Sequence, residues 1–119
     1  MKKFKLDKPR EECGVFGISD HDDASALAAL GLHALQHRGQ EGCGIVSFDG
    51  KTFHLEKRQG LVGDHFTDPV TIKKLPGRSA IGHNRYSTTG EVSLRNIQPF
   101  FADLYGGGIS LAHNGNLTN

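Results

Sequence analysis

Cys13 is the residue with the clearest chemical potential, because it opens the run Cys13–Ile18 directly behind a short charged leader, residues 1–12. Removal of that leader would make Cys13 the first residue of the chain. One residue would then carry both a thiol and a free α-amine, so the nucleophile and the base that activates it would share one carbon skeleton. The arrangement predicts a hydrolytic site that needs no histidine as its base.

The surroundings of Cys13 leave two interpretations open. A free cysteine beside apolar residues also serves as a small buried hydrophobe, as it would in a non-catalytic binding module that keeps its leader. Gly14 and Gly17 favour the catalytic interpretation, because glycine in a strand marks close approach by a ligand or another backbone. The leader is polar and contains Pro9, so it has little apolar surface with which to join a core.

Three polar, glycine-containing clusters follow predicted helix or strand ends: residues 36–44, 82–90 and 113–116. In the last, Asn114 and Gly115 offer a side-chain amide and a backbone N–H that suit an oxyanion, although Asn-Gly is also an ordinary turn. Arg85 in the second cluster fits a substrate carboxylate or a solvated surface. Arg38, beside Gly39, has the same two interpretations and could also contact the last helical carbonyls.

Metal and phosphate sites are disfavoured. Among seven histidines, His33 and His37 have the spacing of a zinc-binding helix, but the glutamate of that motif is missing. Surface or packed histidines explain them better. Gly106–Gly108 lacks the Lys-Ser/Thr of a phosphate loop and is predicted to be a flexible turn.

Composition predicts one globular domain in the cytoplasm. The chain has 119 residues, 36% of them hydrophobic, and a formal net charge of +1. Its basic residues are scattered, which argues against a nucleic-acid partner, and no apolar segment predicts a secretory signal or a membrane span. Cys13 and Cys43 are too few for a disulfide framework and are expected to be reduced.

The order of predicted elements favours an α+β fold. Residues 14–18 form a buried strand, and Asp22 or Asp23 caps a helix that begins near Ala24 and ends in 37–39. The apolar face expected for this helix comprises Leu27, Leu30 or Gly31, and Ala34.

The second half of the chain is predicted to be mostly antiparallel sheet. Residues 44–48 and 52–57 form a β-hairpin through a two-residue Asp49-Gly50 turn. Residues 59–77 form a loop with short helical turns, and 79–86 and 109–113 are further strands. The chain stops at Asn119 with no element to close the sheet, so we expect an incomplete domain.

Taken together, Cys13–Gly17, LQHRGQEGCGIV, GHNRYSTTG, IQPF and LAHNGNLTN resemble the amidophosphoribosyltransferase family, in one order across nearly the whole chain. The resemblance implies an N-terminal nucleophile hydrolase fold, a four-layer αββα sandwich that is incomplete here. Residues 1–12 would be a propeptide and 13–119 part of a class II glutamine amidotransferase domain. The phosphoribosyltransferase domain would be absent, and this piece is expected to be inactive alone.

The same resemblance implies roles for single residues. Cys13 would be the nucleophile that hydrolyses glutamine through a thioester, with Asn114 and Gly115 as the oxyanion hole. Arg85 would hold the glutamine α-carboxylate, Tyr86 would belong to the segment that closes over it, and Arg38 and Gly39 would line the nucleophile.

For the complete enzyme, the resemblance implies that ammonia passes to phosphoribosyl pyrophosphate and gives 5-phosphoribosylamine, the committed step of purine synthesis. Mg²⁺ would assist in the missing domain, and some members carry a 4Fe–4S cluster there. No cofactor is expected in residues 1–119, and the full-length protein is expected to be a homo-oligomer.

The nearest alternative is another glutaminase of this superfamily, such as the hexosamine-phosphate synthase, glutamine-fructose-6-phosphate aminotransferase. That family typically has Tyr-Arg-Gly-Tyr-Asp where this chain has residues 37–41, His-Arg-Gly-Gln-Glu. The His-Arg-Gly-Gln string and IQPF favour the purine enzyme.

Overall fold

The computed structural model describes residues 14–35, 42–85, 94 and 97–113. Its helices and strands follow the chain in the order β1 (Gly14–Ser19), α1 (Ala24–Ala34), β2 (Gly42–Phe48), β3 (Phe53–Gln59), α2 (Val62–His65), α3 (Pro69–Lys73), β4 (Ser79–Arg85), β5 (Phe100–Leu104) and β6 (Gly107–Leu111). No helix in these ranges is long and apolar enough to cross a membrane.

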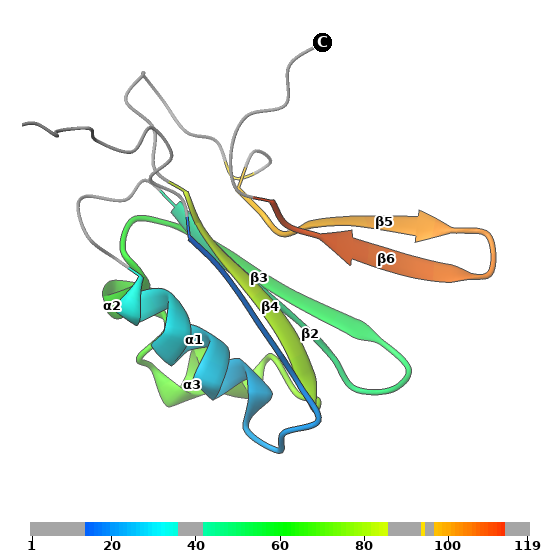
Figure 1. Cartoon of the computed structure of the whole chain (residues 1–119), viewed down its shortest axis with the longest axis horizontal. Helices are drawn as coiled ribbons and strands as arrows, with labels where there is room; N and C mark the ends of the chain where they lie inside the picture. Colours follow the sequence, from blue (N-terminus) through cyan, green and yellow to red (C-terminus); the bar gives the residue numbers. More distant parts are fainter. Residues whose placement is uncertain (1–13, 36–41, 86–93, 95–96, 114–119) are drawn as a thin grey trace, which may run out of the picture.

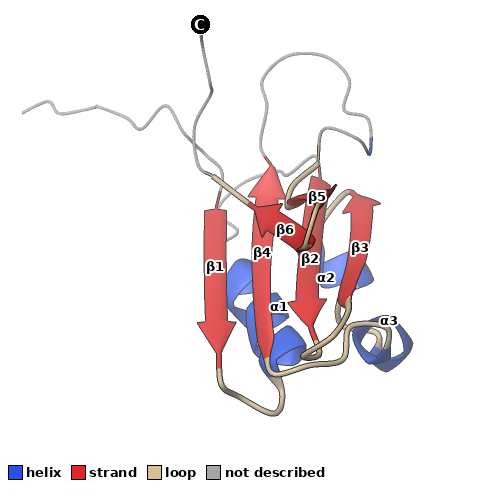
Figure 2. Cartoon of the chain, turned by 90° about the vertical axis from the view of Figure 1, so that its right-hand side faces the viewer, coloured by secondary structure: helices blue, strands red, loops and turns tan. Residues whose placement is uncertain are grey.

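The elements form layers around one four-stranded antiparallel sheet of order β1-β4-β2-β3. The three helices cover one face of this sheet, and the β5-β6 hairpin crosses the other face (Figures 1 and 2). The predicted α+β class and antiparallel pairing are confirmed. The described residues supply a helical layer and two sheets of the expected four-layer sandwich.

The first strand is correctly predicted, but its expected burial is wrong. β1 lies at the edge of the sheet and pairs only with β4 among the described strands. Its residues therefore alternate: Phe16 and Ile18 pack against the core, whereas Val15 is 39% exposed. A short apolar run does not distinguish an edge strand from a central one, because strand order is set by distant pairing partners.

Helix α1 forms where predicted but buries a different face. Its buried residues are Ala24, Ser25, Ala28, Ala29 and Leu32. Of the alternatives Leu30 and Gly31 expected on the apolar face, Leu30 is 65% exposed, whereas Gly31 faces Phe16 of β1. The helix is rich in alanine all round, so periodicity alone does not select a face. The buried face is selected by close packing of the helix on the sheet. A β-carbon at Gly82 of β4 would lie only 2.7 Å from Leu32 Cδ1.

Helix α1 begins at Ala24 as predicted, but its C-terminal end differs from the prediction. The helix ends at Ala34 with Leu35 as its C-cap, before the expected 37–39, of which nothing is described. Asp23 occupies the N-cap position but makes no side-chain cap hydrogen bond. Asp22 pairs instead with Arg78, so of the two predicted caps Asp23 takes the position, without the expected side-chain bond.

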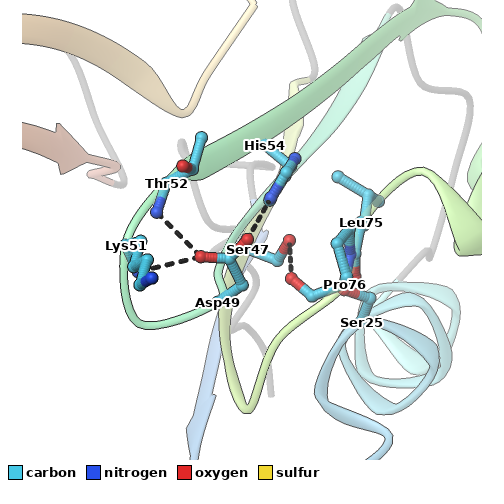
Figure 3. Close-up of polar contacts among 8 residues, drawn as sticks. All are labelled: Ser25, Ser47, Asp49, Lys51, Thr52, His54, Leu75 and Pro76. Carbon is cyan, nitrogen blue, oxygen red and sulfur yellow. Dashed lines mark hydrogen bonds and ion pairs between the residues drawn. The ribbon is translucent and has the colours of Figure 1, made fainter.

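The predicted hairpin is confirmed, although its turn is longer than two residues. Phe48 pairs with Phe53, so the loop comprises residues 49–52. The Asp49 carboxylate accepts hydrogen bonds from the backbone N–H groups of Lys51 and Thr52, at 2.8 and 2.7 Å, and pairs with His54 (Figure 3). The pKa of Asp49 falls to about 2 because of His54 first and these N–H groups second.

Two serine hydroxyls fasten the loop before β4 to the core. Ser25 of α1 donates to the Leu75 carbonyl at 2.6 Å, and Ser47 of β2 donates to the Pro76 carbonyl at 2.8 Å (Figure 3). The short helices α2 and α3 precede this loop and confirm the helical turns predicted within 59–77. These bonds satisfy backbone carbonyls that burial removes from water.

The second sheet was only half predicted. β5 was missed, and β6 covers Gly107–Leu111, two residues earlier than the expected 109–113. The predicted glycine turn is shorter than expected, since Gly107 and Gly108 belong to β6. A side chain at Gly108 would collide with the Phe101 ring, 2.8 Å from its β-carbon, so glycine allows this aromatic residue to cover the strand.

The two sheets meet where residues 97–99 cross β2 over two glycines. A β-carbon at Gly42 would lie 2.5 Å from Ile97 Cδ1, and one at Gly44 would lie 2.3 Å from the Gln98 carbonyl oxygen. Ile97 and Gln98 are 0% and 5% exposed. The Gly-Cys-Gly motif at residues 42–44 and the Ile-Gln-Pro-Phe motif at 97–100 therefore pack directly against each other.

We predict that Gly44→Ala destabilises the protein more than the matched change Gly42→Ala. At position 44 the new methyl meets backbone, which cannot rotate away, and overpacking of this kind costs about 1–3 kcal/mol. At position 42 it meets the Ile97 side chain, which can change rotamer. Urea unfolding of both variants and wild type measures the difference, and equal losses would contradict the close backbone approach.

Candidate functional site

One end of the four-stranded sheet gathers the termini of several elements; we call it the site end. β1 begins there with Gly14, β4 ends there with Arg85, and β2 begins there with Gly42, which pairs with Arg85. The C-terminus of α1 reaches the same place, since a β-carbon at Gly14 would lie 3.0 Å from Leu35 Cβ. Figure 2 shows β1 starting and β4 ending side by side.

Of the predicted site residues, only Arg85 lies in the described part of the chain. The others lie outside the described residues: Cys13, Arg38, Gly39, Tyr86, Asn114 and Gly115. Their described neighbours in sequence are Gly14, Leu35, Arg85 and His113, and these do come together. Gly14 pairs with Asn84, and His113 is hydrogen bonded to His83.

Arg85 is half-buried at the last position of β4. Its Nε atom is buried and has no hydrogen-bond partner, and none of the ion pairs among the described residues involves its guanidinium. Buried polar groups are nearly always hydrogen bonded, so an unpaired guanidinium nitrogen is unusual. The carboxylate-binding interpretation of Arg85 stays a prediction.

Asn84 fastens the end of α1 to β4, a role that the sequence did not reveal. Its side-chain amide donates to the Leu32 carbonyl at 2.9 Å, and the residue is 2% exposed. The same carbonyl accepts from the backbone N–H of the C-cap residue Leu35 at 3.0 Å, so Asn84 adds a second hydrogen bond at the end of the helix. The bond therefore sets where the chain leaves the helix toward residues 36–41.

His83 and Gln98 form a second buried polar group on the opposite face of β4, and both were missed as functional residues. His83 Nε2 lies 3.0 Å from the His113 carbonyl oxygen, and the His113 N–H donates to Gln98 Oε1 at 2.6 Å. Both residues lie within motifs that carried the family resemblance. β4 is a central strand that buries residues on both faces, Gly82, His83 and Asn84 in succession, and no periodicity in its sequence identifies a partner 30 residues away.

The electrostatics of His83 keep its ring neutral. Burial lowers its pKa to about 4, mainly because the charged form would lose its hydration, with the Arg85 charge contributing in the same direction. A carbonyl can only accept, so Nε2 carries the proton and Nδ1 is the unprotonated nitrogen. Nδ1 is buried and has no hydrogen-bond partner.

Cys43 is unsuited to be a nucleophile. It is fully buried in β2, and burial raises its pKa to about 12, so the reactive thiolate is not formed near neutral pH. Within the described ranges, no three His, Cys, Asp or Glu side chains are grouped so that they could hold a metal ion. The described residues of the site end thus offer hydrogen-bond donors and one cation.

We predict that His83 makes the protein less stable as the pH falls from 6.5 to about 4. The folded state binds its proton only near pH 4, whereas the unfolded chain binds it near 6.5, so protonation between these values favours unfolding. The stabilising contribution is complete above pH 6.5. Urea unfolding of wild type and His83→Gln across this range should show a smaller pH dependence in the variant, and identical profiles would contradict the assignment.

Comparison with known proteins gives the same family throughout. Residues 13–119 match the family model described as glutamine amidotransferases class-II. The chain is 68% identical over 113 residues to an amidophosphoribosyltransferase of Rhizobium etli, covering 95% of this chain and 23% of that protein. It is 49% identical over 110 residues to the Bacillus subtilis amidophosphoribosyltransferase, covering 92% of this chain and 23% of that protein.

Solved structures agree with these sequence matches. The glutamine phosphoribosylpyrophosphate amidotransferase of B. subtilis, in complex with ADP and GMP, is 45% identical with a TM-score of 0.76, over 87% of this chain and 22% of that one. An allosteric regulatory enzyme of purine biosynthesis is 42% identical with a TM-score of 0.74, over 81% and 21%. The chain spans about a fifth of the length of these relatives. With 107 of its residues inside the family match, this chain belongs to the class II glutamine amidotransferases.

Proposed function

We propose that this chain is the glutaminase part of an amidophosphoribosyltransferase. In this function glutamine is hydrolysed at the site end, and the ammonia is used to convert phosphoribosyl pyrophosphate into 5-phosphoribosylamine. The relatives of 68% and 49% identity carry the name of this enzyme, which favours it over the hexosamine-phosphate synthase.

One observation carries the proposal: the family match begins at residue 13, and β1 begins at the next residue, Gly14, at the site end of the sheet. Gly14 pairs with Asn84 near the end of β4, so removal of residues 1–12 would free an α-amine on the residue directly before β1. The binding-module alternative offers no reason for the domain to start at a cysteine. We therefore assign residues 1–12 as a propeptide.

The chemistry follows from an N-terminal cysteine. The free α-amine of Cys13, with an ordinary pKa of about 7.7 to 8.0, takes the thiol proton near neutral pH. The sulfur attacks the side-chain amide carbon of glutamine, and the tetrahedral intermediate collapses to a thioester as the amide nitrogen leaves as ammonia. Water then attacks the thioester, which releases glutamate and restores the thiol.

Arg85 anchors the substrate in this scheme, and Asn114 and Gly115 stabilise the oxyanion of the tetrahedral intermediate. The unpaired Nε of Arg85 supports the first assignment. The position of Asn114 directly after His113, whose carbonyl is bonded to β4, supports the second. Tyr86 belongs to the segment that closes over glutamine, and Arg38 and Gly39 line the nucleophile.

The remaining parts of the proposed activity fall outside the segment that matches the relatives. Phosphoribosyl transfer, its Mg²⁺, any iron–sulfur cluster and the contacts of a homo-oligomer are assigned to that larger part. No step of the glutaminase reaction passes through a metal. The charged leader without an apolar stretch behind it favours a cytoplasmic enzyme.

We predict that Cys13→Ala abolishes glutamine hydrolysis but leaves synthesis of 5-phosphoribosylamine from free ammonia in the complete protein. The variant lacks the sulfur that forms the thioester, whereas free ammonia enters after that step. Steady-state assays with glutamine and with ammonium salt measure the two activities. Cys43→Ala is the matched control and should keep both, because that thiol is buried and protonated.

Loss of both activities in Cys13→Ala would contradict this division. Intact-mass measurement of the same wild-type preparation tests the propeptide: the active species should begin at Cys13. An active protein that retains residues 1–12 would overturn the N-terminal nucleophile.

We predict that Arg85→Lys raises the KM for glutamine by about 10- to 100-fold with a much smaller change in kcat. Charge-assisted hydrogen bonds contribute about 1.5–3 kcal/mol, and an anchor on the α-carboxylate acts equally in ground and transition states. Arg78→Lys is the control, because Arg78 pairs with Asp20 and Asp22 away from the site end. A lowered kcat at unchanged KM would contradict the anchor role.

A further inference from the structure

The peptide units on both sides of the His113 Cα atom are held by buried side chains from two different segments. The carbonyl of His113 bonds to His83 Nε2 at 3.0 Å, and its N–H bonds to Gln98 Oε1 at 2.6 Å. His83 and Gln98 are 1% and 5% exposed. Two partly buried hydrogen bonds at one residue restrict its backbone more than a solvent-exposed connection would.

Both holding groups are themselves fixed by the two sheets. His83 belongs to the central strand β4, where it pairs with Gly44 of β2. Gln98 lies directly over the same Gly44, whose missing side chain leaves room for the Gln98 carbonyl. One donor, His83 Nε2, and one acceptor, Gln98 Oε1, thus reach His113 from residues that both lie beside Gly44.

We propose that His83 is a positioning residue that holds the oxyanion-binding pair Asn114 and Gly115 in place through the carbonyl of His113. This inference rests on the proposed function, because it gives that pair its role. His83 itself does not touch the substrate. It acts on His113, the residue directly before Asn114. Loss of the bond between His83 and His113 would therefore displace the pair that follows.

The placement of His83 explains why a neutral histidine is kept there. Arg85 lies two residues further along the same face of β4, so one strand carries both the proposed substrate anchor and the support for the oxyanion pair. Rigid elements position reacting groups better than loops do. Because the pKa of His83 is lowered to about 4, its ring stays a single donor throughout the neutral range.

The test compares His83→Gln with His83→Asn in the complete protein. The amide nitrogen of glutamine reaches the position of His Nε2, whereas that of asparagine reaches only the position of Nδ1. We expect His83→Gln to keep most of kcat for glutamine hydrolysis and His83→Asn to lose on the order of 100-fold, with KM for glutamine unchanged. Unchanged kcat in His83→Asn, or equal losses in both variants, would overturn the inference.

Alkylation of Cys13 by iodoacetamide separates positioning from a general effect on the fold. In this reaction the thiolate sulfur displaces iodide at a saturated carbon, so no oxyanion forms. We expect His83→Asn to be alkylated at the wild-type rate although its kcat has fallen. A parallel fall in both rates would mean that His83 only supports the fold, which overturns the inference.

Gln98→Met provides the same test from the other side of His113 if His83→Asn fails to fold. It removes the acceptor for the His113 N–H, and we expect reduced kcat with unchanged alkylation. Full kcat in Gln98→Met would overturn the inference. A wild-type protein without glutaminase activity would instead overturn the proposed function, and the role of Asn114 and Gly115 with it.

Discussion

The absence of side chains at Gly42 and Gly44 is the constraint on which the rest of this structure depends. Any β-carbon at Gly44 would overlap the Gln98 carbonyl, so only glycine lets residues 97–99 cross the first sheet at this distance. That crossing places β5 and β6 on the open face of the sheet, and β6 delivers His113 to the site end (Figure 1). A packing requirement within β2 thereby decides where a segment 70 residues later meets β4.

Burial gives the polar residues near the end of β4 distinct tasks. Asn84 points to the helical side and fixes the end of α1, whereas His83 points to the second sheet and holds His113. Unpaired buried atoms remain on His83, Asn84 and Arg85, which is unusual for three consecutive residues of a strand. At Arg85 the unpaired nitrogen is what the proposed anchor role requires, because a ligand carboxylate would complete its hydrogen bonding.

The proposed mechanism assigns the base to the N-terminal amine, so no histidine has to act as the base. In a serine or cysteine hydrolase of the triad type, a histidine takes the proton and must titrate near neutral pH. His83 is neutral and deeply buried, so it is unsuited to that task but well suited to be a permanent donor. In the proposed mechanism the proton transfer and the positioning belong to different groups, so dehydration of the histidine does not impair the base.

Much of this protein could be predicted from sequence because its signals are local. Short-range periodicity and turn residues located β1, α1, the β2-β3 hairpin and β4. Residue types alone left two interpretations open for Cys13, Arg85 and the Asn114-Gly115 pair, and only the family resemblance assigned them roles. The buried face of α1, the edge position of β1, the existence of β5, and the roles of His83, Asn84 and Gln98 were not apparent from the sequence. Each of these depends on contacts between residues far apart in the chain, such as Asn84 with Leu32 and Gln98 with Gly44. The sequence by itself determined which groups could react, whereas only the tertiary structure decided which residues hold them, because shape and burial are properties of the packed chain.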